Sequence, residues 1–150
     1  AGKAVCFYEA MQPEFKVYQQ QILKNAKQLC KTLEEEGFRI VSGGTDNHMV
    51  LVDTKASVSL TGKQVETLLD QVHITVNKNA IPFDTEKPIQ TSGIRVGTPA
   101  MTTRGFKEKE FSKVGKLISL IAHHPEDETV KKEVLEQVNI LTKEAPIKPE

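Results

Sequence analysis

The longest periodic pattern in the sequence lies between Pro13 and Glu36. Apolar side chains recur there at spacings of three and four residues, and lysine, glutamine and glutamate fill the positions between them. The apolar set consists of Phe15, Tyr18, Ile22, Ala26, Leu29 and Leu33. This pattern predicts one long amphipathic helix with a single apolar stripe. Pro13 suits the first turn of such a helix, and Gly37 suits its end.

Shorter patterns predict the remaining helices and strands. The other expected helices cover residues 3–11, a segment capped by Thr61 or a neighbour, a segment that begins at Phe106, and residues 130–141. The expected strands cover residues 38–41, 48–52, 74–76 and the segment around Arg95. The polar residues 77–88, which include two prolines, are expected to be irregular. This mixture predicts an α+β fold: a small, mostly antiparallel sheet with helices packed on one face, preceded by a long N-terminal helical segment.

Composition narrows the classes of protein to which the chain can belong. The 20 basic and 20 acidic side chains cancel, so no excess positive charge indicates a nucleic-acid partner. No apolar run approaches the roughly 20 residues that a membrane span requires, and no leader is visible, so we expect a soluble, cytoplasmic chain. Cys6 and Cys30 are expected to be free, packed thiols rather than a disulfide. His123 and His124 have no further ligand at zinc-type spacing, so no metal site is expected.

The stretch from Thr91 to Gly105 contains the most specific residue pattern. Two glycines bracket a short run in which strand alternation places Ile94 and Val96 on one face and Arg95 on the other. An arginine fixed on a strand can offer two parallel donors to a carboxylate or a phosphate. From spacing alone, the simpler interpretation is a solvated arginine on an exposed sheet face.

Three ordered motifs carry a resemblance to one enzyme family. Residues 92–106 (SGIRVGTPAMTTRGF) resemble the C-terminal signature of the serine hydroxymethyltransferases, which are fold-type-I pyridoxal-phosphate enzymes. Residues 42–53 (SGGTDNHMVLVD) and 74–84 (ITVNKNAIPFD) resemble the same family in the same order, and residues 3–33 match it in character. The resemblance extends to about residue 120. It implies the small C-terminal domain of the enzyme: residues 1–36 as a helical connection from an absent large domain, and residues 37–150 as the small α+β domain.

The resemblance also implies roles for individual residues. In the family, the arginine that corresponds to Arg95 binds the substrate carboxylate, and the asparagine that corresponds to Asn79 contacts folate. Lys87, Pro88 and Ile89 fall where bacterial-type members contact folate, partly through the backbone. Those members usually have Ser-Pro-Phe there, so side-chain roles for Lys87 and Ile89 do not follow. From the residues alone, Asn79 is equally a turn asparagine bonded to its own backbone.

Two further polar features have simpler interpretations than catalysis. Asp46, Asn47 and His48 bring acid–base groups together, but the same residues suit a turn that leads into a strand, which is what we expect. None of the lysines lies in the threonine-rich context that precedes the cofactor-binding lysine in the family. We therefore expect no catalytic residue in this sequence, and we expect the chain to be inactive alone.

The implied activity belongs to a larger enzyme. That enzyme would interconvert serine and tetrahydrofolate with glycine and 5,10-methylenetetrahydrofolate, using pyridoxal 5'-phosphate as its cofactor. The implied partners are serine or glycine, tetrahydrofolate, the large domain and further copies in a homo-oligomer, with no nucleic acid and no membrane. Two alternatives stay open. The chain can be a stand-alone protein-interaction domain, or it can be the small domain of another fold-type-I enzyme such as an aminotransferase, which would have no reason to contain NKNAIPFD.

Overall fold

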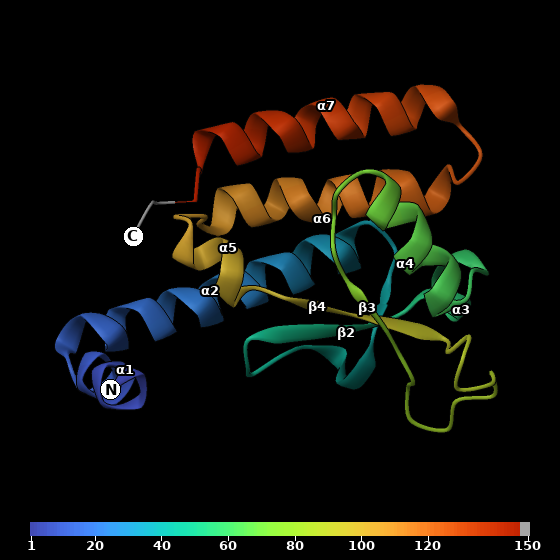
Figure 1. Cartoon of the computed structure of the whole chain (residues 1–150). Coiled ribbons are helices and arrows are strands. Elements are labelled where there is room, and N and C mark those ends of the chain that lie inside the picture. The colour runs from blue at the N-terminus through green and yellow to red at the C-terminus, as the bar shows by residue number, and fades with distance from the viewer. Residues whose placement is uncertain (148–150) are drawn as a thin grey trace.

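The computed structural model describes residues 1–147 and shows an α+β fold (Figure 1). Its helices are α1 (Gly2–Ala10), α2 (Pro13–Glu35), α3 (Thr54–Val58), α4 (Gly62–Gln71), α5 (Pro99–Thr103), α6 (Glu108–His123) and α7 (Glu128–Glu144), with a 3-10 turn η1 (Val41–Gly43). Its strands are β1 (Arg39–Ile40), β2 (Met49–Asp53), β3 (Asn77–Asn79) and β4 (Gly93–Gly97). The last three residues of the predicted small domain, 148–150, lie outside the described residues. The predicted fold class is confirmed.

The four strands form one antiparallel sheet in the order β1-β2-β4-β3. Ile94 and Val96 of β4 are buried, and Arg95 between them is exposed on the other face, as strand alternation predicts. The residues of β2 that pair with Ile94 and Val96 are buried as well. One face of the sheet is therefore apolar and covered, and Arg95 stands on the open face.

Helices pack against the covered face in two layers. Figure 1 shows α2, α4 and α6 next to the sheet and α7 along the far side of α6. The largest fully buried side chains of this core include Phe111, Leu29, Leu33, Leu69, Ile118, Ile121 and Val134. The apolar residues of the predicted helical stripes meet here, and this burial is the main source of stability.

One buried amide joins the long helix to the segment that follows β4. Asn25 of α2 is 0% exposed, and its Nδ2 donates hydrogen bonds to Thr102 Oγ1 at 2.8 Å and to the carbonyl of Phe106 at 2.9 Å. Its Oδ1 accepts a hydrogen bond from Gln21 at 2.9 Å. The residue interrupts the apolar stripe of α2 without leaving a buried polar group unsatisfied.

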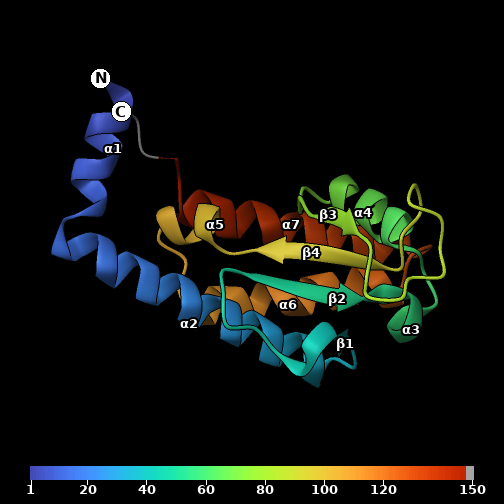
Figure 2. The same ribbon diagram turned by 90° about the horizontal axis from the view of Figure 1, so that it is seen from below.

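The N-terminal part of the chain packs much less than its apolar residues predict. In α2 the stripe is buried from Ile22 onward, whereas Phe15 is 37% exposed. In α1 no residue is buried, and Figure 2 shows this helix standing away from the sheet and the other helices. Cys6 of α1 is accordingly exposed, so the prediction of two packed thiols is wrong for Cys6 and confirmed for Cys30.

Two local predictions are wrong. The third strand does not cover residues 74–76; it covers Asn77–Asn79, in the stretch that was expected to be irregular. The backbone there pairs with β4, and the N–H of Lys78 donates to the carboxylate of Glu66 at 3.0 Å, so polar side chains do not prevent a strand. The short helices α3 and α5 were not predicted, since each has only five residues. Among residues 1–147, no helix combines the length and the apolar character needed to cross a membrane.

Candidate functional site

Arg95 lies at the centre of the open sheet face. It pairs across the sheet with Leu51 of β2 on one side and with Asn77 of β3 on the other. Its side chain is exposed, and within residues 1–147 its guanidinium makes neither a hydrogen bond nor an ion pair. By contrast, Arg39 on β1 is paired with the carboxylate of Asp53. The strand therefore holds a guanidinium whose donors are free for an anion.

A hollow of about 800 Å³ opens beside Arg95. It is bounded by one side of α2, by the segment from Val41 to Asn47, and by the open sheet face. Arg95 and Asn79 both line it, so the structure brings these two predicted site residues to one place. Lys27 and Lys31 of α2 also line the hollow.

The charged side chains and the thiol that line the hollow determine whether it suits anion binding or covalent catalysis. Glu34 and Asp46 line it together with the two lysines, so its charge is mixed rather than uniformly basic. Burial, and then the nearby carboxylate of Glu34, raise the pKa of the Cys30 thiol. A thiol with a raised pKa remains protonated and is a poor nucleophile. The hollow therefore suits anion binding by Arg95 better than covalent catalysis by Cys30.

Asn79 is half-buried at the end of β3, opposite Gly93. Its side-chain N–H donates to the carbonyl of Ala80 at 2.7 Å, which is the local backbone bond that a turn asparagine makes. Asn79 also lines the hollow, and this hydrogen bond leaves its side-chain oxygen unused. The geometry thus accommodates both interpretations of this residue.

The other three predicted folate contacts lie apart from the hollow. Lys87, Pro88 and Ile89 are exposed in the loop between β3 and β4, and none of them lines the hollow. The carbonyl of Lys87 accepts hydrogen bonds from Gln90 N–H at 2.8 Å and Thr91 N–H at 3.0 Å, which closes a turn. These three exposed residues form the outer rim of the β3–β4 loop and are not part of the wall of the hollow beside Arg95.

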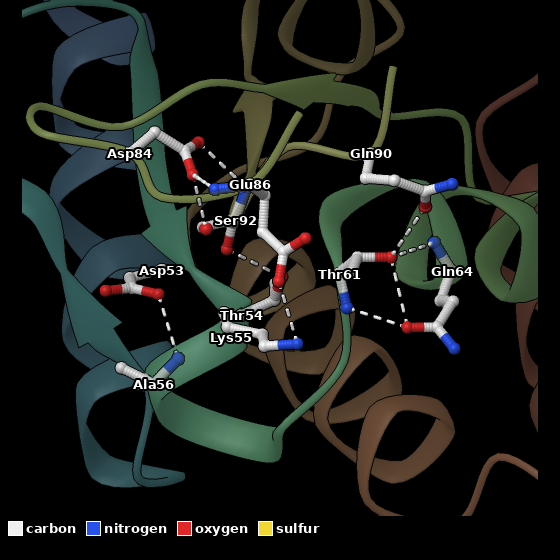
Figure 3. Close-up of polar contacts among 10 residues, drawn as sticks. All are labelled: Asp53, Thr54, Lys55, Ala56, Thr61, Gln64, Asp84, Glu86, Gln90 and Ser92. Carbon is white, nitrogen blue, oxygen red and sulfur yellow. Dashed lines mark hydrogen bonds and ion pairs between the residues drawn. The ribbon is translucent and has the colours of Figure 1, made fainter. Parts of the chain in front are cut away.

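The loop from Ala80 to Ser92 is organised by Asp84, a residue that sequence reasoning missed (Figure 3). Asp84 Oδ2 accepts hydrogen bonds from Ile81 N–H at 3.2 Å and Ser92 N–H at 2.9 Å. Asp84 Oδ1 accepts from Glu86 N–H at 2.9 Å and from the Ser92 hydroxyl at 2.6 Å. A carboxylate that meets four donors is typical of a turn anchor, but the eight-residue separation from Ser92 gives no sequence signal.

These hydrogen bonds change the acidity of Asp84. Desolvation is the largest influence and raises the pKa of Asp84, but it is outweighed by the donors that bind the ionised form. These donors are the Ser92 hydroxyl and the backbone N–H groups of Glu86, Ser92 and Ile81, and together they lower the pKa to about 2. The anchor is therefore ionised throughout the neutral and mildly acidic range.

The end of this loop is also held by the two helices beside it (Figure 3). The first free N–H of α4, at Gly62, donates to the carbonyl of Thr91 at 2.9 Å. A Cβ on Gly62 would lie 2.0 Å from the carbonyl oxygen of Gly93, and a Cβ on Gly93 would lie 2.6 Å from that of Val52. Only glycine permits this approach. Thr61 and Gln64 complete the start of α4 with a capping box, as predicted for Thr61.

The segment before β2 is a turn, as expected. The N–H of Met49 donates to the side chain of Asn47 at 2.9 Å, and Thr45 donates to the carbonyl of Met49 at 2.6 Å. The His48 side chain is exposed, and its carbonyl accepts from the N–H of Thr98 at 3.0 Å. Within residues 1–147, no three His, Cys, Asp or Glu side chains gather as a metal site would require.

A comparison with protein families shows to which family the chain belongs. The family model described as serine hydroxymethyltransferase matches residues 1–118 of the 150-residue chain. The match includes the hollow, the anchored loop and the strand that carries Arg95, and it stops within α6. The chain belongs to the serine hydroxymethyltransferase family.

Proposed function

We propose that this chain supplies the substrate-carboxylate contact and part of the folate site of a serine hydroxymethyltransferase. The reaction would interconvert serine and tetrahydrofolate with glycine and 5,10-methylenetetrahydrofolate. The family is one of hydroxymethyltransferases of serine and glycine one-carbon metabolism and generally depends on pyridoxal phosphate and folate. The observation that carries the proposal is the guanidinium of Arg95, which lies beside the hollow and has no partner among residues 1–147.

Arg95 would hold the carboxylate of serine or glycine. A guanidinium keeps its charge at every working pH and binds a carboxylate through two parallel hydrogen bonds. Its place on a central strand, between Leu51 and Asn77, fixes the direction from which the carboxylate is gripped. Binding of this kind contributes to catalysis by positioning the amino acid rather than by proton transfer.

Asn79 and the rim of the loop would contact tetrahydrofolate. Asn79 lines the hollow, and an amide can meet the mixed donors and acceptors of a pterin ring. Lys87, Pro88 and Ile89 would contribute through exposed backbone and apolar surface at the outer rim. We assign these three residues to the more distant part of the folate because none lines the hollow.

The lysines of the hollow do not fit covalent attachment of pyridoxal phosphate. A lysine with that role is desolvated or otherwise activated. Lys27 is exposed, and the Lys31 side chain is 69% exposed with its ammonium 3.8 Å from the carboxylate of Glu35. Bound pyridoxal phosphate would supply the electron sink for cleavage of the Cα–Cβ bond. We assign its binding to the large domain of the enzyme.

The same proposal gives each part of the chain a place in the enzyme. Residues 1–36 would connect to a large domain that binds the cofactor, and residues 37–150 would form the small domain. The exposed apolar residues of α1 support this division, because a helix without any buried residue requires a covering surface. The complete enzyme would be a homo-oligomer.

A chimaeric enzyme tests the proposal. In a serine hydroxymethyltransferase whose corresponding segment is replaced by this chain, we expect serine cleavage that depends on tetrahydrofolate. Arg95→Lys should lower turnover at least about 100-fold, because a lysine cannot reproduce the two-pronged contact. Arg39→Lys is the matched control: it changes the arginine on β1, which already has a carboxylate partner, and should leave turnover within about twofold.

The free chain provides a second test. Mixed with pyridoxal phosphate, it should form no stoichiometric lysine adduct that absorbs at visible wavelengths and responds to glycine. Such an adduct would show that one of its own lysines binds the cofactor. Wild-type turnover in the Arg95→Lys chimaera would remove Arg95 from its assigned role.

A second function, docking of a separate protein partner, is favoured by α1. Val5, Phe7 and Tyr8 of this helix, and Met11 directly after it, are between 57% and 74% exposed. A stand-alone interaction domain would use this surface and would not require Arg95. The chimaera separates the two functions, since an interaction domain would give no tetrahydrofolate-dependent serine cleavage.

A further inference from the structure

Asp84 occupies a special position between the two proposed binding residues. It joins the first residues of the β3–β4 loop, at Ile81, to the last, at Ser92. Ile81 follows Asn79 by two positions, and Ser92 precedes Arg95 by three. Because Asn79 pairs with Gly93 in the sheet, the carboxylate closes the loop at the point where β3 ends and β4 begins (Figure 3).

Ser92, which is bound by Asp84, also connects the loop to the rest of the fold. It is 3% exposed, and its carbonyl accepts hydrogen bonds from Lys55 N–H at 3.0 Å and from the Thr54 hydroxyl at 3.1 Å. Asp84 therefore holds a residue that is already fixed to the start of α3. Loss of Asp84 would leave the loop attached by the Lys55–Glu86 ion pair and by the hydrogen bonds that α3 and α4 donate to the carbonyls of Gln90, Thr91 and Ser92.

The carboxylate cannot be replaced without losing hydrogen bonds. Asparagine offers one acceptor oxygen in place of two, so at most part of the four-donor arrangement survives in Asp84→Asn. Alanine removes it entirely and leaves the Ser92 and Ile81 donors without their partner. The expected disorder is local, because no residue between 77 and 93 belongs to the hydrophobic core.

We propose that Asp84 is a positioning residue, which sets Asn79 and Arg95 in a fixed mutual arrangement by closing the loop between their strands. This inference rests on the proposed function, in which these two residues contact the two substrates. It adds a role for the aspartate of the NAIPFD motif, which does not line the hollow. Closure of the loop would keep the folate and carboxylate contacts from moving independently.

Amide hydrogen exchange and NMR spectra of the full 150-residue chain test this role without any ligand. In Asp84→Ala, exchange at Glu86 and Ser92 should rise about tenfold or more, while exchange in α7 stays unchanged. The resonances of the Asn79 side-chain amide and the Arg95 Nε–H should shift. Asp84→Asn should fall between wild type and Asp84→Ala for both readouts.

Glu86→Gln is the matched control in the same loop. It removes the 2.9 Å ion pair with Lys55 but leaves the Glu86 backbone N–H that Asp84 accepts, so the spectra should stay close to wild type. A pH titration adds a readout specific to the carboxylate: the Glu86 and Ser92 amides should titrate together in wild type and not in Asp84→Asn. If Asp84→Ala does not fold, Ser92→Ala removes only the hydroxyl bond and should raise loop exchange about threefold.

Two results would overturn the inference. Unchanged exchange and unchanged Asn79 and Arg95 resonances would show that the loop is held without Asp84. An equal rise of exchange in the loop and in α7 would show general destabilisation rather than positioning. Neither result depends on the Arg95→Lys chimaera, so failure of the positioning role and failure of the proposed function can be told apart.

Discussion

The β3–β4 loop and the N-terminal helix α1 both lie within the family match, yet they are stabilised in opposite ways. The loop has few apolar contacts but is fixed by Asp84, by the close approach of Gly62 to Gly93, and by donors from two helices. The helix α1 is rich in apolar residues but buries none of them. The loop obtains its shape from within the chain, whereas α1 requires a surface that the described residues do not provide. Equivalent substitutions in the two regions should therefore have very different effects.

A large difference is expected between two glycines, one that contacts the end of the loop and one in α1. Gly62→Ala should destabilise the fold by about 3 kcal/mol or more, because its Cβ would overlap the Gly93 carbonyl oxygen and the backbone would have to move. Gly2→Ala in α1 meets no atom within 4 Å and should change stability by less than about 0.5 kcal/mol. Urea unfolding followed by circular dichroism measures both. Equal stabilities would contradict the close approach of α4 to β4.

A smaller effect is expected for the buried amide of α2. Asn25→Ala should cost about 2 kcal/mol, because Thr102 and the Phe106 carbonyl lose a buried partner. The side chain of Gln12, at the junction of α1 and α2, donates to the exposed carbonyl of Tyr8, so Gln12→Ala should cost about 0.5 kcal/mol or less. The same unfolding measurement applies. A similar cost for both variants would mean that the polar contacts of Asn25 do not contribute to stability.

The pH dependence of stability isolates Asp84. Its pKa is lowered from 3.8 to about 2 in the fold, so its contribution is fully present above about pH 5 and is lost as the pH falls toward 2. After allowance for solvent screening at this partly exposed site, we expect a loss on the order of 1 kcal/mol. Thermal unfolding from pH 6 to pH 2.5 should show this loss in wild type and a shallower one in Asp84→Asn. Parallel curves for the two proteins would contradict the lowered pKa.

The smallest effect is expected in α1 itself. Phe7 is 67% exposed, so Phe7→Ala should change the stability of the free chain by less than about 0.5 kcal/mol. Phe111 is 2% exposed in the core, and Phe111→Ala should cost about 3–5 kcal/mol. A large loss in Phe7→Ala would show that α1 is already covered in the free chain, by self-association or by its own fold. Sedimentation at several concentrations distinguishes these two explanations.

The sequence predicted the regular parts of the molecule well, because hydrophobic periodicity reports burial directly. It predicted the α2 stripe, the capping role of Thr61 and the opposite faces of Ile94 and Arg95. It misplaced the third strand, since Asn77–Asn79 is held by backbone pairing with β4 and by Glu66 rather than by apolar side chains. It also predicted packing for Cys6, because periodicity cannot show that a partner surface for α1 is missing.

The candidate site was predicted unevenly for a similar reason. Arg95 and Asn79 were found through the family resemblance, and the structure places both beside one hollow. The resemblance did not show that Lys87, Pro88 and Ile89 lie away from that hollow. Asp84 was missed because its partners are backbone groups and a distant serine, and such contacts arise only when the chain folds back on itself. Sequence reasoning therefore identifies ligand-binding side chains more readily than the residues that support them.

The satisfied amide of Asn25 has a consequence for how the molecule can bend. The helix α2 cannot swing or rotate against the segment that follows β4 without breaking the buried hydrogen bonds to Thr102 and Phe106. The part of α2 from Ile22 onward and the sheet are therefore expected to move as one rigid unit. The natural pivot lies at Gln12 and Pro13, where α1 meets α2 and no side chain is buried. If Arg95 changes its orientation toward a neighbouring domain, this rigid unit would therefore move as a whole about the junction of α1 and α2.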